Sequence, residues 1–503
     1  MLSRIDKSVS REVNPKKGPS LRIHGIEGPK SASTTAASPP DPAPGEKDVM
    51  AFTARHVAFD PADHRPAPRR YAWAVFAVMF LLMVVDYIDR QVVVAMFPHL
   101  KGQWNLSDGQ LGGLVSIVSI TVALGAVPLS LLADRWSRVK SVFLMAMVWS
   151  LATISCAFAQ SYGHLLAARA MVGVGEAAYG TVGVALLATL FPARMRSTVI
   201  GAFLAAGMIG SVLGVVLGGY ISQRWGWQAG FGAVGIPGLV LCLVFLLVVR
   251  DYKTVALPSS RSAANDQRLT ARVVVAELLR PRTALITCIG AGLNLLVVST
   301  IWAWLPSYLN RYYGLATDQA GLKTGIVVLV GAIGALIWSR VADRLSARIP
   351  NARLIVPAVA AVLTMVFMCA AFVGLPPGNA QFLLIVAGGF VMAGSIGPTD
   401  AVVVDVIHPA LRATAASVLS LMRNLFGLAG GPLLAGMLSD AYGLQFAMEV
   451  VPVICLAAAA VFLLAARTYQ ADRSRVGDVE PELDANEQDR PIRLTPEPKS
   501  SLQ

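Results

Sequence analysis

The residues best suited to chemistry in this chain lie in one short stretch, Asp86–Arg90, with the sequence Asp-Tyr-Ile-Asp-Arg. Residues 71–85 before it and 92–97 after it carry no charge. Three ionisable side chains therefore fall inside one expected membrane-spanning helix. A charge at membrane depth costs roughly 2.5–3.5 kcal/mol on insertion scales, so such residues are kept where they have a partner or a function.

A second set of charges recurs on one face of a later apolar block. Arg169, Gly173, Glu176, Gly180 and Gly183 follow one another at intervals of four, three, four and three residues, which places them on one helical face. The small residues allow neighbouring backbone or substrate to come close. Two interpretations are open: a functional charged face, or a structural strut between the Arg and the Glu.

The depth of these groups indicates how they meet. At about 1.5 Å per residue, Asp89 lies roughly 14 Å inside the outer end of its helix and Arg169 roughly 10 Å inside its own, so the two can pair. Glu176 lies about 10 Å further in by the same rise. Burial disfavours an ionised carboxylate and a nearby guanidinium favours it, so a carboxylate balanced between the two can take and release a proton. We therefore predict a relay from Asp89, Arg90 and Arg169 to Glu176. Asp86 is either a direct participant or an intrahelical partner of Arg90.

Fewer charges lie inside the second half of the chain. Asp400 and Arg423 fall in the middle of neighbouring apolar blocks, and we predict that they form an ion pair, either structural or ready to receive a substrate anion. Asn294, in the middle of another block, either hydrogen-bonds substrate or bridges helices. Trp302 and Trp304 lie near an outer block end, where we expect interfacial anchors.

Composition defines the class of protein. Of 503 residues, 55% are hydrophobic and only 14% are charged, whereas soluble domains carry about a quarter charged residues. The net charge of +12 does not indicate nucleic-acid binding, because the basic residues fall between apolar blocks. The five cysteines lie singly in apolar blocks, which favours core packing over a disulfide or metal site.

Twelve apolar blocks are long enough to cross a membrane as helices, and open sheets cannot span lipid. The sequence therefore predicts an all-α membrane protein. The blocks are 71–97, 110–132, 141–160, 163–190, 197–222, 229–250, 283–309, 321–342, 353–375, 380–407, 413–438 and 445–466.

The distribution of Lys and Arg predicts the orientation. With both termini in the cytoplasm, the outer loops hold only four of the 42 basic residues, namely Lys101, Arg224, Arg311 and Lys323. Cytoplasmic loops are the ones enriched in Lys and Arg, so both termini are expected inside. Three basic residues remain within spans, namely Arg90, Arg169 and Arg423.

The two halves of the chain repeat each other. A Ser-x-x-x-Asp-Arg element follows span two at 130–138 and span eight at 339–348. Similar segments follow span four at 191–198 and span ten at 408–414. Repeats of six spans place a substrate site at their interface near the membrane midplane.

These features resemble the major facilitator superfamily of secondary transporters. Its inner-loop motif corresponds to Asp134, Arg135 and Arg138, with Ser130 and Ser137 where the family has glycine. The resemblance implies that these charges, with Asp343 and Arg344 in the second half, form a cytoplasmic gate. The fourth-span motif Arg-x-x-x-Gly-x-Gly is intact at 169–175.

A closer resemblance is to the Spinster branch, whose members move lysolipids and related amphiphiles. It rests on 87–90 in span one, 173–179 in span four and 235–239 in span six. The resemblance implies that Asp89, Arg90 and Glu176 are functional. A Tyr-x-Asp-Arg element also occurs in the organic anion:cation symporter branch, which keeps uptake of a small carboxylate open.

We therefore expect two six-helix bundles of the major facilitator fold, at 71–250 and 283–466. A disordered tail at 1–70, a cytoplasmic linker at 251–282 and a disordered tail at 467–503 complete the chain. Met50 is an alternative start, so residues 1–49 are either a flexible tail or an extension.

The predicted function is proton-coupled transport of an amphiphilic organic anion or lysolipid by alternating access. No nucleotide-binding loop of the Gly-x-x-x-x-Gly-Lys-(Ser/Thr) type occurs in the sequence. No nucleophile–base pair that would indicate an enzyme was found either. We expect no cofactor, no metal and no nucleic acid. The expected partners are protons, the substrate and the lipid of the cell (inner) membrane, in which a multi-pass monomer would lie.

Overall fold

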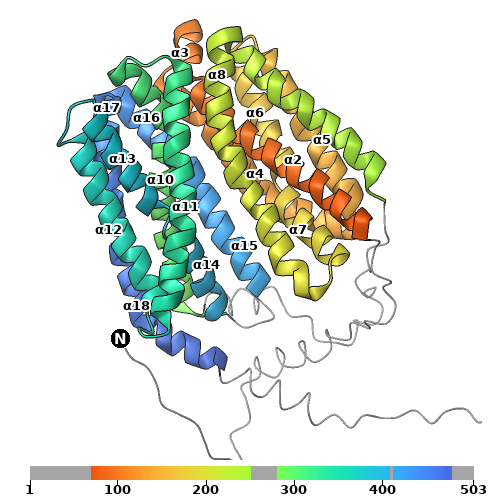
Figure 1. The fold of residues 1–503 in the computed structure, drawn as a ribbon, viewed down its shortest axis with the longest axis vertical. Coiled ribbons are helices and arrows are strands. Elements are labelled where there is room, and N and C mark those ends of the chain that lie inside the picture. Colours follow the sequence, from red (N-terminus) through yellow and green to blue (C-terminus); the bar gives the residue numbers. More distant parts are fainter. Residues whose placement is uncertain (1–68, 251–279, 408–411, 478–503) are drawn as a thin grey trace, which may run out of the picture. The chain divides into compact units, whose positions relative to one another are not determined.

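The computed structural model describes residues 69–250, 280–407 and 412–477, apart from a few side chains. Every regular element within these ranges is helical, and all of them belong to one unit (Figure 1). The predicted tail 1–70 and the linker 251–282 lie almost entirely outside the described residues, as does the C-terminal tail beyond residue 477.

The helices of the first half follow the predicted blocks. Three of them begin at a serine cap, whose Oγ accepts a hydrogen bond from the backbone N–H three residues later (Ser107, Ser137 and Ser161). Ser137, which stands where the superfamily motif has glycine, therefore begins a helix. The elements are α2 (Arg69–Ala95), α3 (Phe97–Trp104), α4 (Asp108–Arg135), α5 (Arg138–Ala157), α6 (Tyr162–Glu176), α7 (Tyr179–Leu190) and α8 (Ala193–Val248).

The second half contains more interruptions. Spans ten, eleven and twelve are each divided into shorter pieces, one of them π-helical and one 3₁₀-helical. The elements are α10 (Arg282–Tyr313), α11 (Thr317–Ser346), α12 (Ala352–Phe372), α13 (Asn379–Met392), α14 (Ile396–Asp405), α15 (Arg412–Met422), η4 (Arg423–Ala429), α16 (Gly430–Tyr442), α17 (Leu444–Val450), η5 (Val451–Val453) and α18 (Ile454–Gly477).

The prediction of twelve spans is confirmed. The described residues contain 11 apolar helical segments of span length, and one of these, Arg194–Val248, is 55 residues long. Inside it, Gly226 has a φ of 82° and a ψ of 165°, a conformation that favours glycine because it lacks a Cβ. The chain bends there, so α8 supplies both span five and span six.

The C-terminal helix is longer than predicted. Residues 467–477, which the sequence assigned to a disordered tail, continue α18 to Gly477. Two side chains attach this extension to the bundle. Tyr469 donates its hydroxyl to Asp405 at 2.7 Å, and Asp472 accepts the backbone N–H of Thr283 at 2.9 Å.

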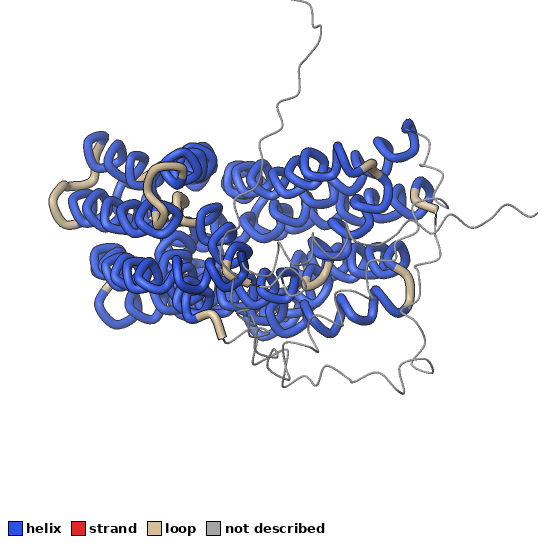
Figure 2. The backbone as a smooth tube through the Cα atoms, turned by 90° about the horizontal axis from the view of Figure 1, so that it is seen from below, coloured by secondary structure: helices blue, strands red, loops and turns tan. Residues whose placement is uncertain are grey.

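Each half forms its own group of helices (Figures 1 and 2). In the first half α8 packs along α2 and α5, and α4 packs along α6; in the second, α18 packs along α10 and α12. The halves meet where α4 packs on α16 and η4, and where α8 packs on α11. We call these groups the N-terminal and C-terminal bundles. The end that carries α3 is called the outer end, following the predicted orientation.

Candidate functional site

Span four is broken at its acidic residue. Helix α6 ends at Glu176 and α7 begins at Tyr179, so the carboxylate lies at the break. Two glycines just before it bring other helices close. A Cβ at Gly173 would collide with the carbonyl of Val118 on α4, and one at Gly175 would lie 2.5 Å from the backbone nitrogen of Trp149 on α5. Tight packing against two helices therefore positions Glu176.

Five charged residues gather around this break, and we call them the N-terminal charge cluster: Asp86, Asp89, Arg90, Arg169 and Glu176. Arg169 Nη1 lies 3.2 Å from Asp89 Oδ2 and also donates to the Asp89 carbonyl oxygen. Arg90 Nη2 lies 2.9 Å from Glu176 Oε2, and Arg90 Nε lies 3.8 Å from Asp86 Oδ2. The cluster therefore consists of two ion-paired sets, one on each guanidinium.

This geometry sharpens the predicted relay. Asp89 and Arg169 lie within ion-pair distance, as their depths suggested. Arg90 instead reaches inward to Glu176, so it links the two levels of the cluster. The strut between Arg169 and Glu176 is not formed, because each residue has its close partner on α2.

Accessibility differs within the cluster. The side chain of Arg169 is 1% exposed and that of Asp89 is fully buried, whereas the side chain of Arg90 is 19% exposed. The Arg90 side chain is therefore open to contact, whereas that of Arg169 is not. One oxygen of each of the two aspartates, Asp86 Oδ1 and Asp89 Oδ1, receives no hydrogen bond, although both are buried.

The cluster has more acidic than basic groups. Three carboxylates face two guanidiniums, so the fully ionised cluster carries one uncompensated negative charge. An unpaired charge away from water is strongly disfavoured. Binding one proton makes the cluster neutral, and releasing it leaves one carboxylate without a counterion.

The C-terminal bundle contains the second predicted ion pair. Arg423 Nη1 lies 2.6 Å from Asp400 Oδ1, and Arg423 Nη2 donates to Thr399 Oγ1 at 2.7 Å and to the Ile396 carbonyl oxygen at 3.0 Å. The side chain of Asp400 is 51% exposed and that of Arg423 is 17% exposed. This pair is charge-balanced and open to contact.

Span ten is broken near this pair, as span four is broken at Glu176. Helix α13 ends at Met392 and α14 begins at Ile396. Asn294 Nδ2 donates to the Met392 carbonyl oxygen at 3.1 Å and to Ser395 Oγ at 2.8 Å. Of the two roles considered for Asn294, the structure shows the bridge between helices.

The predicted gate residues lie at the opposite end from α3. The side chains of Asp134 and Arg135 lie outside what the structure describes, Arg138 is the first residue of α5, and Arg344 is exposed. Asp343 lies 3.2 Å from Arg353 of its own bundle. Arg353 also lies 2.5 Å from Asp405. The gating role of these residues remains a prediction.

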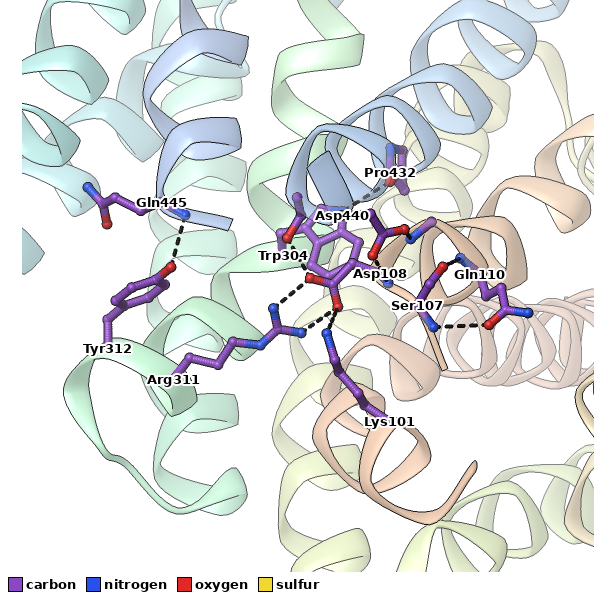
Figure 3. Close-up of polar contacts among 12 residues, drawn as sticks. Lys101, Ser107, Asp108, Gln110, Trp304, Arg311, Tyr312, Pro432, Asp440 and Gln445 are labelled. Atoms are coloured by element: carbon purple, nitrogen blue, oxygen red, sulfur yellow. Dashed lines mark hydrogen bonds and ion pairs between the residues drawn. The ribbon is translucent and has the colours of Figure 1, made fainter. Parts of the chain in front are cut away.

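A polar network that was not predicted from the sequence joins the bundles at the outer end (Figure 3). Asp108, at the start of α4, binds both terminal nitrogens of Arg311 at 2.6 and 2.7 Å and Lys101 Nζ at 2.6 Å, and it accepts the hydroxyl of Ser439. Asp440 in turn accepts the backbone N–H groups of Asp108 and Gly109, each at 2.7 Å. Acidic groups are favourable at a helix N-terminus.

Two further observations concern the outer end: the role predicted for Trp304 is wrong, and the start of α4 has a signal in the sequence. Trp304 is not an interfacial anchor, because it is fully buried, packs against Phe97 with ring centroids 5.2 Å apart, and donates to the Pro432 carbonyl oxygen. The capping box of Ser107 and Gln110 was the one signal in the sequence that α4 begins beside Asp108.

Comparison with known proteins identifies the family. The model of the Major Facilitator Superfamily matches residues 79–431 and also 287–499. The chain belongs to the Major Facilitator Superfamily. The predicted family is thereby confirmed, and this superfamily member is a multi-pass membrane transporter rather than an enzyme.

The relatives within the superfamily support the Spinster branch. The chain is 24% identical to Protein spinster of Drosophila melanogaster over 74% of this chain and 62% of that protein. It is 23% identical to a sphingosine-1-phosphate transporter of Xenopus tropicalis, over 87% and 91% of the two chains. It is 28% identical to a gallate transporter of Pseudomonas putida, over 80% and 93%.

A solved structure shares the fold. The crystal structure of a bacterial homolog of the human lysosomal transporter Spinster, in an inward-facing and unoccupied conformation, superimposes with a TM-score of 0.73. The sequences are 23% identical, and the match covers 81% of this chain and 99% of that chain.

Proposed function

We propose that this superfamily transporter is a secondary active transporter that couples protons to the movement of an amphiphilic organic anion or lysolipid by alternating access. The observation that carries the proposal is the charge balance of the N-terminal charge cluster. Its three carboxylates and two guanidiniums are neutral only with one proton bound.

Exposure of the arginines supports an anionic substrate. Arg90 and Arg423 are partly accessible and come from opposite bundles, whereas Arg169 is closed off. An anionic head group that contacts either accessible guanidinium competes with its carboxylate partner. Release of Glu176 from Arg90 favours protonation of that carboxylate, which links anion binding to proton binding.

The relatives support the substrate class. Spinster proteins and a sphingosine-1-phosphate transporter match most of this chain. A phosphorylated or carboxylated amphiphile supplies an anionic head group for Arg90 or Arg423 and an apolar tail for the spans.

The relation to a gallate transporter favours a second candidate, uptake of a small aromatic carboxylate. Thermal-shift titration of purified protein separates the two, because a ligand that binds only the native state raises the melting temperature. Saturable stabilisation by a lysophospholipid but not by gallate supports the proposed substrate class. The reverse result supports the aromatic acid.

Gradient-driven flux in proteoliposomes tests the proton coupling. Glu176→Gln and Asp89→Asn each remove the surplus negative charge, so we expect gradient-driven accumulation to be lost while counterflow exchange continues. Asp318→Asn, at a partly exposed ion pair with Arg224, is the matched control and should transport normally. Normal pH-dependent accumulation in both cluster variants would overturn the proposal.

A further inference from the structure

Span eleven contains a π-helical segment that begins at Arg423. The segment η4 lies between α15 and α16 and covers seven residues, Arg423–Ala429. A π-helix pairs residues five apart, is rare, and occurs frequently at functional sites. Pro432 explains part of its position, because proline has no N–H for the carbonyl of Gly427. The Gly427 carbonyl accepts the backbone N–H of Gly430 instead, and it also accepts the hydroxyl of Ser299, whose Oγ lies 2.8 Å away.

A second carbonyl of the segment is bound from the opposite bundle. Ser116 on α4 is 1% exposed and donates its hydroxyl to the Ala429 carbonyl oxygen at 2.6 Å. The Ser299 bond stays within the C-terminal bundle, whereas the Ser116 bond exists only while α4 lies against span eleven. Only the Ser116 hydrogen bond therefore depends on whether the two bundles are in contact.

Ser116 lies at the inner end of a regular seam between the bundles. The seam residues on α4 are four apart, at Asp108, Gly112 and Ser116. A Cβ at Gly112 would collide with the Pro432 carbonyl group. Asp108 contacts Ser439 beyond it. The seam thus runs from the outer network down to Ala429, and Arg423 follows six residues further inward.

We propose that Ser116 is a positioning residue that sets Arg423 through the π-helical segment. When α4 separates from α16, the Ala429 carbonyl loses its hydroxyl donor and η4 returns to α-helical spacing. The change in residues per turn rotates Arg423 about the helix axis, away from Asp400 and Thr399. Opening of the outer end thereby changes the anion affinity of Arg423.

Spin-label distances test both halves of this inference. The outer pair places labels at Gly102→Cys, where a side chain meets nothing within 4 Å, and at Tyr442→Cys, which is 69% exposed. The second pair, called the inner pair because both labels lie within the C-terminal bundle, uses Phe426→Cys in η4 and Leu383→Cys on α13, both exposed. Each pair is made with Cys369→Ser, because the other four native cysteines are buried.

We expect Ser116→Ala to raise the outer-open population about fivefold, the effect of losing one net hydrogen bond. The population of a second distance between the inner pair of labels should rise in the same proportion. Ser116→Thr keeps the hydroxyl and should restore both distributions. Ser119→Ala, also buried on α4, controls for removal of a serine and should leave both unchanged.

Three results would overturn the inference: unchanged distances in Ser116→Ala, an outer change without the inner one, or failure of Ser116→Thr to restore them. Ser299→Ala should alter the inner distance while leaving the outer pair as in the wild type. The inference rests on the alternating access of the proposed function. These distances need no substrate or proton gradient, so their outcome is distinguishable from that of the flux tests.

Discussion

At the scale of single residues, burial separates arginines that the sequence treats alike. Arg90, Arg169 and Arg423 all lie inside spans, yet only Arg90 and Arg423 are accessible. Arg169 has a buried aspartate as its close partner, which makes it a support for Asp89. Under the proposed function, substrate contact therefore falls to the two accessible guanidiniums.

Removal of a buried guanidinium should damage the fold. Arg169→Ala leaves Asp89 buried without its counterion, which typically costs about 3–5 kcal/mol. Arg423→Ala should cost about 1 kcal/mol or less, because its partner Asp400 is half exposed and such pairs are weak. Chemical or thermal denaturation in detergent measures both. Equal losses would contradict the assignment of Arg169 as a support.

One residue outside the spans gives a pH prediction. His99 on α3 approaches Thr317 of α11 at 3.2 Å, and partial burial lowers the pKa of His99 from its ordinary value of 6.5. The unfolded chain then binds the proton more readily than the folded chain, so stability falls as pH drops below 6.5. We expect the melting temperature of His99→Gln to fall less than that of the wild type between pH 7 and pH 5. Parallel curves would refute this.

At the scale of helices, apolar length predicted the spans but not their interruptions. The breaks after Glu176 and Met392 lie beside contacts with other helices, and such contacts cannot be read from hydropathy. Depth along the helix predicted the pair of Asp400 with Arg423, because depth depends only on residue count. It did not predict that Arg90 would bind Glu176, since that depends on the rotation of two helices relative to each other.

Two glycines of one face provide a matched test of packing. A Cβ at Gly173 would collide with Thr121 and Val118, whereas a Cβ at Gly180 meets nothing within 4 Å. Gly173→Ala should therefore separate α4 from α6 and cost about 1–3 kcal/mol, as overpacking does. Gly180→Ala should be neutral or stabilising by up to about 1 kcal/mol. Thermal denaturation of the two variants measures the difference, and equal melting temperatures would contradict this prediction.

At the scale of the whole molecule, the outer network joins the two bundles. In the sequence, Lys101 and Arg311 counted only as two of the few basic residues in the outer loops, which predicted the orientation. The structure shows that both bind Asp108. Arg311 lies about two hundred residues from Asp108, so only the folded chain reveals the pair. Asp108 thus joins Lys101 of its own bundle to Arg311 of the opposite bundle at the outer end.

Neutralising that partner should favour opening. Asp108→Asn loses charge-assisted bonds to two cations, so the outer-open population measured with labels at Gly102 and Tyr442 should rise at least tenfold. Asp318→Asn affects a looser pair at 3.8 Å and should change the population by less than about twofold. An unchanged distribution in Asp108→Asn would show that the network does not hold the bundles together.

The central claim is that the surplus carboxylate of the N-terminal charge cluster carries the coupled proton. The most direct measurement records proton movement with a pH-sensitive dye inside proteoliposomes while a substrate gradient is applied without a proton gradient. We predict that substrate drives proton flux in the wild type and in Asp318→Asn, and that Glu176→Gln moves substrate without protons. Substrate-driven proton flux that persists in Glu176→Gln and Asp89→Asn would contradict the account.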